Sequence, residues 1–162
     1  FGRLIVQFHK NNAYVTLNGN RIDEFTVKEI LPYSLENDLF PGYDKVNISL
    51  GELKRIIEKD TWKTALQNQK GVYLLTDTSN GKKYVGSAYG ENMILGRWLD
   101  YLRTGHGGNV GLKPLTFEHI QQNFRCSILD IYKSTTDDQI IIDREKWWKD
   151  VLQSGKFGYN KN

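Results

Sequence analysis

The strongest constraint on the fold is a pair of β-rich segments joined by a short run of turn-forming residues. Gly71 to Thr76 and Lys82 to Ser87 have the composition of strands, and the residues between them, 77–81, are typical of a hairpin connection. An apolar helical repeat follows from Asn92 to Thr104 and stops at Gly105, a residue suited to the left-handed conformation of a helix end. We therefore expect an antiparallel hairpin followed by an amphipathic helix.

The remaining patterns predict an α+β fold. They indicate a helix over about 115–122, a third strand over 125–132 and a helix from about 136 to 153. This order packs as a small three-stranded, mainly antiparallel sheet flanked by helices. Before it, residues 1–66 carry short strands at 2–9, 13–18 and 24–30, and then a helix with the capping-box residues Ser49 and Glu52. We therefore expect a β-rich accessory region over 1–66 and a main domain over 67–162.

Composition limits the compartment and the partners. Among the 162 residues, 39% are hydrophobic and 25% are charged, and no apolar run approaches the length of a membrane span. The sequence begins at Phe1, and no leader segment follows, so we expect a trimmed or processed fragment. We expect the protein to be cytoplasmic and to have no membrane partner. The single cysteine, Cys126, excludes an internal disulfide, and the net charge of +3 permits a polyanionic partner without predicting one.

Glu145 is the most informative single residue because it lies on an apolar helix face. Ile141, Glu145, Trp148 and Leu152 follow one another at spacings that place them on one side of the predicted C-terminal helix. A desolvated carboxylate there requires a partner, either a metal ion or an arginine. The simpler alternative is a structural ion pair at the edge of the face, with Arg97 or Arg125.

Arg97 lies at the boundary of the apolar face of its own helix, between Ile94 and Trp98, with Tyr101 one turn further on. An arginine in this position can bind a phosphate through two hydrogen bonds or stabilise charge that develops on it. Asp100, three residues later, offers the alternative of a local ion pair.

Tyr73 and Tyr84 form one site only if the hairpin has a suitable register. A four-residue loop over 77–80 places them directly opposite each other on one face, with Cβ atoms about 5 Å apart. A two-residue turn at Asn80 and Gly81 keeps them on one face but four residues out of step, roughly 13 Å along the strand. Tyrosines in a hairpin also suit ordinary core packing. A compact site therefore requires the first register, in which Tyr73 faces Tyr84.

Two further candidates lie in polar surroundings. His106, in a glycine-rich loop, could act as a base or contact a phosphate, or it could simply be solvated. Lys83, next to Tyr84, could face a phosphate backbone, or it could belong to a solvated hairpin end.

Taken together, these residues resemble the GIY-YIG nuclease superfamily over about residues 70–160. The resemblance rests on Gly71-Val72-Tyr73, Tyr84-Val85-Gly86, Arg97, Glu145 and Asn160, in that order. Residues 86–90 and 105–109 resemble the branch found in bacterial and phage proteins of restriction or unassigned role. Some relatives carry a histidine one turn after the arginine, where this chain has Tyr101, which leaves the roles of Tyr101 and His106 in substrate binding open.

The resemblance implies one-metal hydrolysis of a DNA phosphodiester bond. Glu145 would hold Mg²⁺ or Mn²⁺. Tyr73 would take a proton from the attacking water, Tyr84 would orient the water and the phosphate, and Arg97 would bind the developing charge. Asn160 would fix the phosphate or a tyrosine.

We therefore expect a divalent-metal-dependent DNA endonuclease, either a monomer or a homodimer. Two alternatives remain. One is a DNA-binding or interaction module that keeps the fold without catalysis, and the other is a nuclease specialised for DNA structures in repair or in resolving branched DNA.

Overall fold

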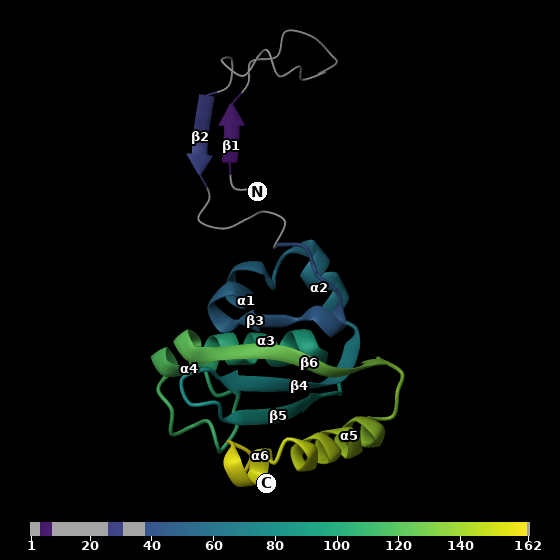
Figure 1. The fold of residues 1–162 in the computed structure, drawn as a ribbon. Coiled ribbons are helices and arrows are strands. Elements are labelled where there is room, and N and C mark those ends of the chain that lie inside the picture. Colours follow the sequence, from purple (N-terminus) through teal and green to yellow (C-terminus); the bar gives the residue numbers. More distant parts are fainter. Residues whose placement is uncertain (1–3, 8–25, 31–37, 162) are drawn as a thin grey trace. The chain divides into compact units, whose positions relative to one another are not determined.

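The computed structural model describes residues 4–7, 26–30 and 38–161. The chain divides into two compact units, residues 1–39 and residues 40–162 (Figure 1). The elements in chain order are β1 (Leu4–Gln7), β2 (Thr26–Ile30), the 3-10 helix η3 (Tyr43–Lys45), β3 (Asn47–Ser49), α1 (Leu50–Ile56), α2 (Asp60–Leu66), β4 (Gln69–Asp77), β5 (Lys83–Ala88), α3 (Met93–Thr104), α4 (Phe117–Asn123), β6 (Phe124–Lys133), α5 (Asp138–Val151) and α6 (Ser154–Phe157).

The N-terminal unit contains a two-stranded antiparallel sheet. Strands β1 and β2 pair from Leu4 with Ile30 to Gln7 with Thr26, with a shift in register between Ile5 and Val6. These strands fall within the segments expected at 2–9 and 24–30. The strand expected at 13–18 lies outside the described residues.

The second unit confirms the α+β prediction and adds a strand to it. Its sheet has four strands in the order β3-β6-β4-β5, and every neighbouring pair is antiparallel. The three expected strands are β4, β5 and β6. Strand β3 is additional, and it pairs with β6 through Asn47 opposite Ser127 and Ser49 opposite Arg125.

The division of the chain near residue 39 differs from the boundary expected at 66/67. Strand β3 extends the main sheet, and Leu50, Leu53 and Ile56 of α1 are fully buried in the same hydrophobic core as Leu75 of β4. These side chains need the sheet in order to leave water, and each buried aliphatic side chain contributes about 1.5–3 kcal/mol. Residues 40–66 therefore complete the main fold.

Helix α1 begins with the capping box that the sequence predicted. The Ser49 hydroxyl accepts a hydrogen bond from the Glu52 amide at 3.2 Å, and a Glu52 carboxylate oxygen accepts one from the Ser49 amide at 3.1 Å. Both groups satisfy backbone donors that a helix start leaves unpaired. The cap fixes the point at which the chain changes from β3 to helix.

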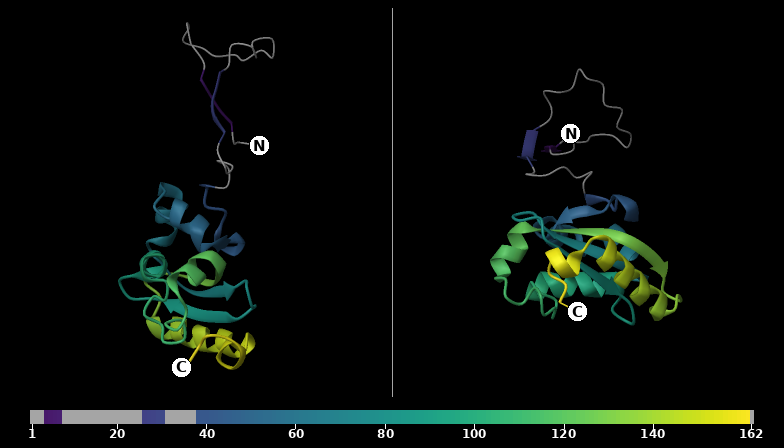
Figure 2. Two further views of the ribbon diagram at one scale, coloured as in Figure 1. Left: turned by 90° about the vertical axis from the view of Figure 1, so that its left-hand side faces the viewer. Right: turned by 60° about the horizontal axis from the view of Figure 1, so that its bottom comes forward.

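The two faces of the sheet are covered by different helices. Tyr73 and Leu75 pack with Trp98 of α3 in the larger core, and Val72 and Val85 pack with Ile141 of α5 in the smaller one. Figure 2 shows α3 and α5 on opposite sides of the sheet. Since successive strand residues point to opposite faces, one hairpin supplies both cores.

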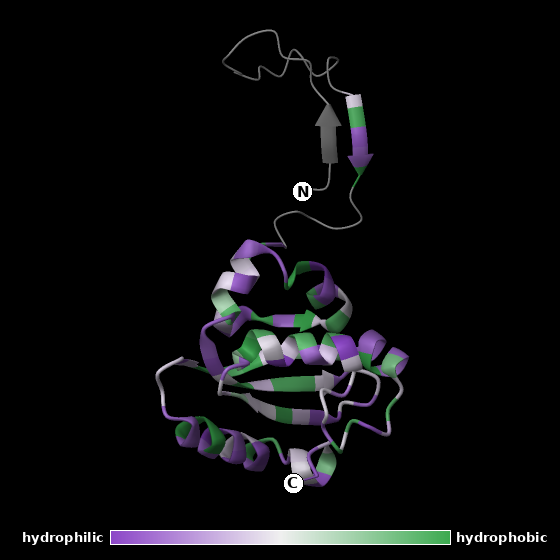
Figure 3. Cartoon of the chain, turned by 180° about the vertical axis from the view of Figure 1, so that it is seen from behind, coloured by the Kyte–Doolittle hydropathy of each residue, from purple (hydrophilic) through white to green (hydrophobic). Residues whose placement is uncertain are grey.

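Hydrophobic residues gather in the middle of β4, whereas α5 mixes hydrophobic and hydrophilic residues (Figure 3). Cys126 is buried in β6 as a free thiol, as expected from the single cysteine. None of the helices in the described ranges is long and apolar enough to cross a lipid bilayer.

Candidate active site

The hairpin register places Tyr73 and Tyr84 on one face but not directly opposite each other. Tyr73 pairs with Gly86 and Tyr84 pairs with Leu75, so the prediction that the two tyrosines face each other was wrong. The Asp77 amide donates to the Lys82 carbonyl at 2.9 Å, which leaves a four-residue loop over 78–81. The loop has the predicted length but begins one residue later. The tyrosines are therefore diagonal neighbours on one side of the sheet.

The cause of this register is the side chain of Asp77. Its Oδ1 atom accepts hydrogen bonds from the amide of Ser79 at 3.0 Å and from the hydroxyl of Ser79 at 2.6 Å. An aspartate that bonds to the backbone two residues later starts a turn at its own position. Asp77 thus remains at the end of the strand, and Gly81 closes the loop with a φ of 76°.

Gly86 makes room for the first tyrosine. Gly86 lies opposite Tyr73, and a Cβ atom added at Gly86 would overlap the ring and hydroxyl of Tyr73. The Tyr73 side chain therefore lies across the position where another residue would carry a side chain. The glycine of the second triplet is needed for the placement of the tyrosine of the first.

Tyr73 is fully buried and contacts two polar groups of α3. Its hydroxyl lies 2.9 Å from the hydroxyl of Tyr101, and Arg97 Nε donates to it at 3.2 Å. Burial raises the pKa of Tyr73 above its ordinary value, while the positive charge of Arg97 opposes this shift. Burial also raises the pKa values of Tyr84 and Tyr101. The group that most favours a tyrosinate at Tyr73 is therefore Arg97.

Asn109 connects these side chains and was missed by the sequence analysis. Its Oδ1 atom accepts hydrogen bonds from Tyr84 Oη at 2.7 Å and from Arg97 Nη2 at 3.0 Å. Its Nδ2 atom donates to Tyr101 Oη at 2.5 Å. In the sequence, Asn109 stood out only as part of the stretch 105–109, which resembles one branch of the family but is also typical of a flexible link.

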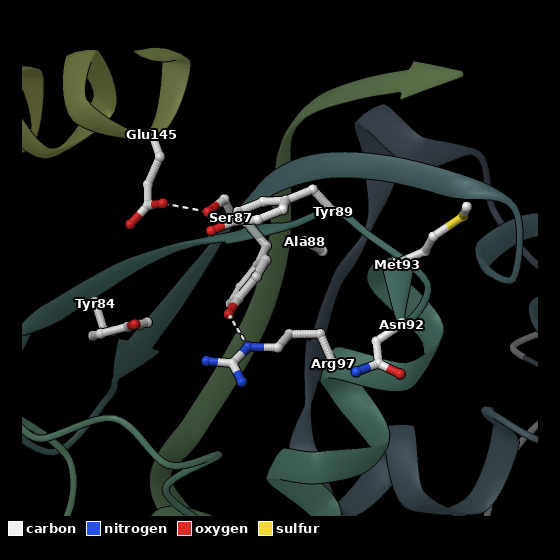
Figure 4. Close-up of a pocket in the computed structure, with 9 residues that line it drawn as sticks. Tyr84, Ser87, Ala88, Tyr89, Asn92, Met93, Arg97 and Glu145 are labelled. Carbon is white, nitrogen blue, oxygen red and sulfur yellow. Dashed lines mark hydrogen bonds between the residues drawn. The ribbon is translucent and has the colours of Figure 1, made fainter. Parts of the chain in front are cut away.

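Glu145 projects from α5 toward the hairpin, and both its oxygens have partners. Ser87 donates its hydroxyl to Oε2 (Figure 4), and Lys149 Nζ lies 2.7 Å from Oε1. The prediction that Glu145 lies on the apolar face of its helix agrees with the neighbouring positions of Ile141, Trp148 and Leu152 in one core. Lys149 is one helical turn from Glu145, a spacing that was visible in the sequence but was not considered.

The alternative ion pairs considered for these residues do not form. Arg125 donates to the Asn47 side chain at 3.0 Å, and Asp100 pairs with Arg103 at 2.7 Å. The third hydrogen bond of Arg97 is a donation from Nη1 to the Gly107 carbonyl at 2.9 Å. Arg97 and Glu145 therefore each have partners other than those alternatives.

One pocket of about 370 Å³ brings four of the candidate residues together. Figure 4 shows Glu145 approaching from α5 and Arg97 from α3, with Tyr84 to the left of the Arg97 guanidinium. The pocket is lined by Tyr73, Tyr84, Ser87, Ala88, Tyr89, Asn92, Met93, Arg97 and Glu145. A substrate group in this pocket would meet one cation, one carboxylate and three phenols.

The other candidates occupy different positions. Asn160 is buried and forms hydrogen bonds with both the amide and the carbonyl of Val85, at 2.9 and 2.8 Å, so it holds the strand that carries Tyr84. Tyr101 lies behind Tyr73 and is fully buried. His106 accepts a hydrogen bond from the Gly108 amide, and Lys83 donates to the Gly81 carbonyl at 3.4 Å. Neither His106 nor Lys83 lines the pocket.

The donor set suits a metal ion that retains most of its water. No cluster of three or more His, Cys, Asp or Glu side chains is present in the part of the chain that the structure describes. Glu145 is therefore a single carboxylate at the pocket, beside the hydroxyl of Ser87. Mg²⁺ is commonly bound by one or two carboxylates together with waters and substrate phosphates. The residues present fit such an ion.

Comparisons with known proteins agree on the region around this pocket. The model of the GIY-YIG catalytic domain family matches residues 69–160, more than half of the 162-residue chain. Intron-associated endonuclease 1 of Enterobacteria phage T4 is 34% identical over 92 residues, which cover 57% of this chain and 36% of that relative. The chain thus matches little more than a third of the length of this relative.

Two solved structures are also similar. A mutant of the catalytic domain of intron endonuclease I-TevI is 31% identical, with a TM-score of 0.46, over 58% of this chain and 94% of that one. A second structure of the catalytic domain of homing endonuclease I-TevI is 28% identical, with a TM-score of 0.42, over 57% of this chain and 98% of that one.

Proposed function

Because this chain belongs to the GIY-YIG family, we propose that it is a divalent-metal-dependent endonuclease that hydrolyses phosphodiester bonds in DNA. The observation that carries the proposal is the pocket in which Tyr73, Tyr84, Arg97 and Glu145 converge. The first three come from the hairpin and α3, and the fourth comes from the opposite side of the sheet. A core-packing role does not require these four polar groups to share one opening.

Glu145 would hold Mg²⁺ or Mn²⁺, with the Ser87 hydroxyl orienting one carboxylate oxygen. Bound there, the ion would polarise the phosphate, stabilise the leaving oxygen and cancel the negative charge by which Glu145 raises the pKa of Tyr73. Ser87 follows Gly86 on β5 and points to the opposite face of the sheet from Tyr73. The carboxylate proposed to hold the ion and the Tyr73 side chain therefore approach the pocket around the β5 edge of the sheet, since β5 is an outer strand.

Tyr73 would take the proton from the attacking water. A phenol with a raised pKa is protonated near neutrality, so it needs nearby positive charge in order to act as a base. Arg97 Nε supplies a direct hydrogen bond to its oxygen at 3.2 Å. The same guanidinium would stabilise the charge that develops on the phosphate.

The alternative of a non-catalytic binding module makes a different demand on Glu145. A module without a metal site could pair the carboxylate with Arg97 and leave no room for a metal ion, whereas Glu145 in this protein lines the pocket. This observation favours the nuclease. A preference for branched or nicked DNA remains compatible with the pocket and is decided by the choice of substrates.

Cleavage of mixed DNA substrates tests the proposal. We expect the purified protein to cut plasmid, nicked or branched DNA with Mg²⁺ or Mn²⁺ and to stop when EDTA is added. Glu145→Gln and Tyr73→Phe should abolish cleavage while the circular dichroism spectrum is retained. Asp143→Asn is the matched control because Asp143 lies on the same helix in an exposed pair with Lys146 at 3.2 Å.

The two outcomes are separable. Intact DNA in every reaction, beside a known nuclease that cuts, would refute the endonuclease and favour the binding module. Retained cleavage in both the Glu145 and Tyr73 variants would leave an endonuclease but refute the assigned residues.

A further inference from the structure

The hydrogen bonds of Asn109 determine which way the protons of the pocket point. A single carboxamide contacts Tyr84, Arg97 and Tyr101, at distances of 2.7, 3.0 and 2.5 Å. The first two of these residues line the pocket in which phosphodiester hydrolysis is proposed, and the third supports Tyr73. Asn109 therefore joins three groups whose orientations matter for that reaction.

The orientation of the Asn109 amide is fixed by Arg97. A guanidinium has donors and no acceptor, so the group facing Arg97 Nη2 must be the oxygen of the amide. The amide nitrogen is then turned to Tyr101 Oη, which accepts. The reversed orientation would set two donors against each other at Arg97.

It follows that Tyr84 has no proton left for the pocket. Asn109 Oδ1 carries no hydrogen, so Tyr84 Oη must be the donor in their 2.7 Å contact. A phenol has one hydroxyl proton, and Tyr84 donates it to Asn109. Toward the pocket Tyr84 can offer only lone pairs, which bind a water proton but not an unprotonated phosphate oxygen.

We propose that Asn109 is a positioning residue that makes Tyr84 a hydrogen-bond acceptor, so that Tyr84 orients the attacking water rather than the phosphate. The inference rests on the proposed endonuclease function. It divides the two tyrosines: Tyr84 holds the water, whereas Tyr73 accepts a hydrogen bond from Arg97 Nε. Burial raises the pKa of Tyr73, and this contact with Arg97 opposes the shift. The phosphate is left to Arg97 and to the ion at Glu145.

The loop around Asn109 is built to hold the amide in place. The Asn109 amide donates to the His106 carbonyl at 2.9 Å, and the Asn109 carbonyl accepts from the amides of Leu112 and Lys113, both at 3.1 Å. Gly107 has a φ of 53°, and a Cβ atom there would crowd the Tyr101 ring. The backbone on both sides of Asn109 is thus fixed independently of its side chain, which favours a specific role for the carboxamide.

Asn109→Leu removes the acceptor and tests the proposal by kinetics. We expect the single-turnover cleavage rate to fall by about 100-fold with little change in the DNA concentration at half-saturation, because water is misplaced while DNA contacts remain. Asn109→Ala, which adds no bulk, is measured beside it in case the leucine disturbs folding. The matched control is Asn47→Leu, which removes an exposed amide that also accepts from an arginine, Arg125, at 3.0 Å.

A spectroscopic measurement reports the proton itself. In protein labelled at tyrosine ¹³Cζ, with the Tyr84 signal assigned from Tyr84→Phe, either Asn109 variant should shift the Tyr84 signal and Asn47→Leu should not. This readout does not depend on cleavage. If the wild type cuts no DNA but the shift occurs, the endonuclease function is refuted while the proton assignment stands.

A double-mutant cycle gives the decisive comparison. If Asn109 acts through Tyr84, adding Asn109→Ala to Tyr84→Phe should cost much less than Asn109→Ala costs alone. Multiplicative losses, or an unshifted Tyr84 signal in both Asn109 variants, would overturn the proposal.

Discussion

The candidate active site and the Asp77 cluster are two polar networks that both include residues of the β4–β5 hairpin. They differ in whether their polar groups line a pocket. The Asp77 cluster comprises Asp77, Ser79, Asn80, His119 and Tyr159. Asp77 is fully buried and accepts from the Ser79 amide and hydroxyl, from Asn80 Nδ2 at 2.9 Å, from Tyr159 Oη at 2.6 Å and from His119 Nε2, which lies at 2.8 Å. Its carboxylate therefore has its hydrogen bonds inside the protein.

The candidate active site uses the same kinds of groups but leaves some of them facing a pocket. Tyr73, Tyr84, Arg97 and Glu145 all line it. The pKa directions follow this difference. Burial alone would raise the pKa of Asp77, but hydrogen bonds from Ser79, Tyr159 and His119 hold it below its ordinary range, whereas the pKa values of the site tyrosines are raised. We call the Asp77 cluster the closed network and the candidate active site the open network. Hydrogen bonds satisfied inside the protein stabilise the fold, whereas polar groups that line a pocket can still bind a substrate.

The largest effect is expected in the open network. Arg97→Gln removes the cation that contacts Tyr73, Asn109 and the Gly107 carbonyl, and we expect cleavage to fall by about 10³-fold. Arg103→Gln is the control, because Arg103 lies on the same helix and is 75% exposed in its pair with Asp100. Single-turnover kinetics and thermal unfolding are measured on both. Equal losses of activity in the two variants would remove the distinction between the networks.

The closed network should show the reverse behaviour. Asp77→Ala leaves the donors of Ser79, Asn80 and Tyr159 without their acceptor, and we expect the free energy of unfolding to fall by about 3 kcal/mol. Cleavage per folded molecule should fall by less than about tenfold. Urea unfolding and cleavage at low temperature separate the two quantities. A loss of activity without a loss of stability would contradict the assignment of this cluster to stability.

Parts of this picture followed from local sequence, because they depend on contacts between near neighbours. The capping box at Ser49 and the apolar face around Glu145 both arise within one or two helical turns, where spacing decides geometry. The hairpin was predicted for the same reason. Its register was not, because the Asp77 side chain recruits Ser79, and this moves the loop by one residue.

The remaining features depend on residues that are distant in the sequence. Strand β3 has three residues, and it becomes a strand by pairing with β6 about eighty positions later. Asn109 is part of the site because Arg97 and Tyr84 reach it from two other elements. No periodicity marks either feature, so both required the tertiary structure.

Acid provides a finer test of the closed network. Because the pKa of folded Asp77 is depressed, its contribution to stability is present above the unfolded value of about 4 and is lost as the pH falls below it. We expect the wild type to lose roughly 1–2 kcal/mol more than Asp77→Asn between pH values of about 5 and 2. Urea midpoints across this range measure it. Parallel pH profiles for the two proteins would show that Asp77 is not the group that titrates.

The smallest expected effect concerns the ion pair that Lys149 forms with Glu145 of the open network. Lys149 Nζ is 2.7 Å from Glu145, and the two side chains are 16% and 15% exposed, so a metal ion at this carboxylate competes with an ammonium that is already there. Lys149→Met should therefore tighten Mn²⁺ binding about fivefold, or about 1 kcal/mol, in calorimetric titrations without DNA. Lys146→Met is the matched control, since its partner is Asp143 on the exposed side of the same helix. If Lys149 instead bound the DNA backbone, its loss would weaken DNA binding in a salt-dependent manner and leave the Mn²⁺ affinity unchanged. That result would show that Lys149 binds the DNA and that its ion pair with Glu145 does not affect metal binding. Tighter Mn²⁺ binding would instead identify Lys149 as the group that a metal ion displaces from Glu145.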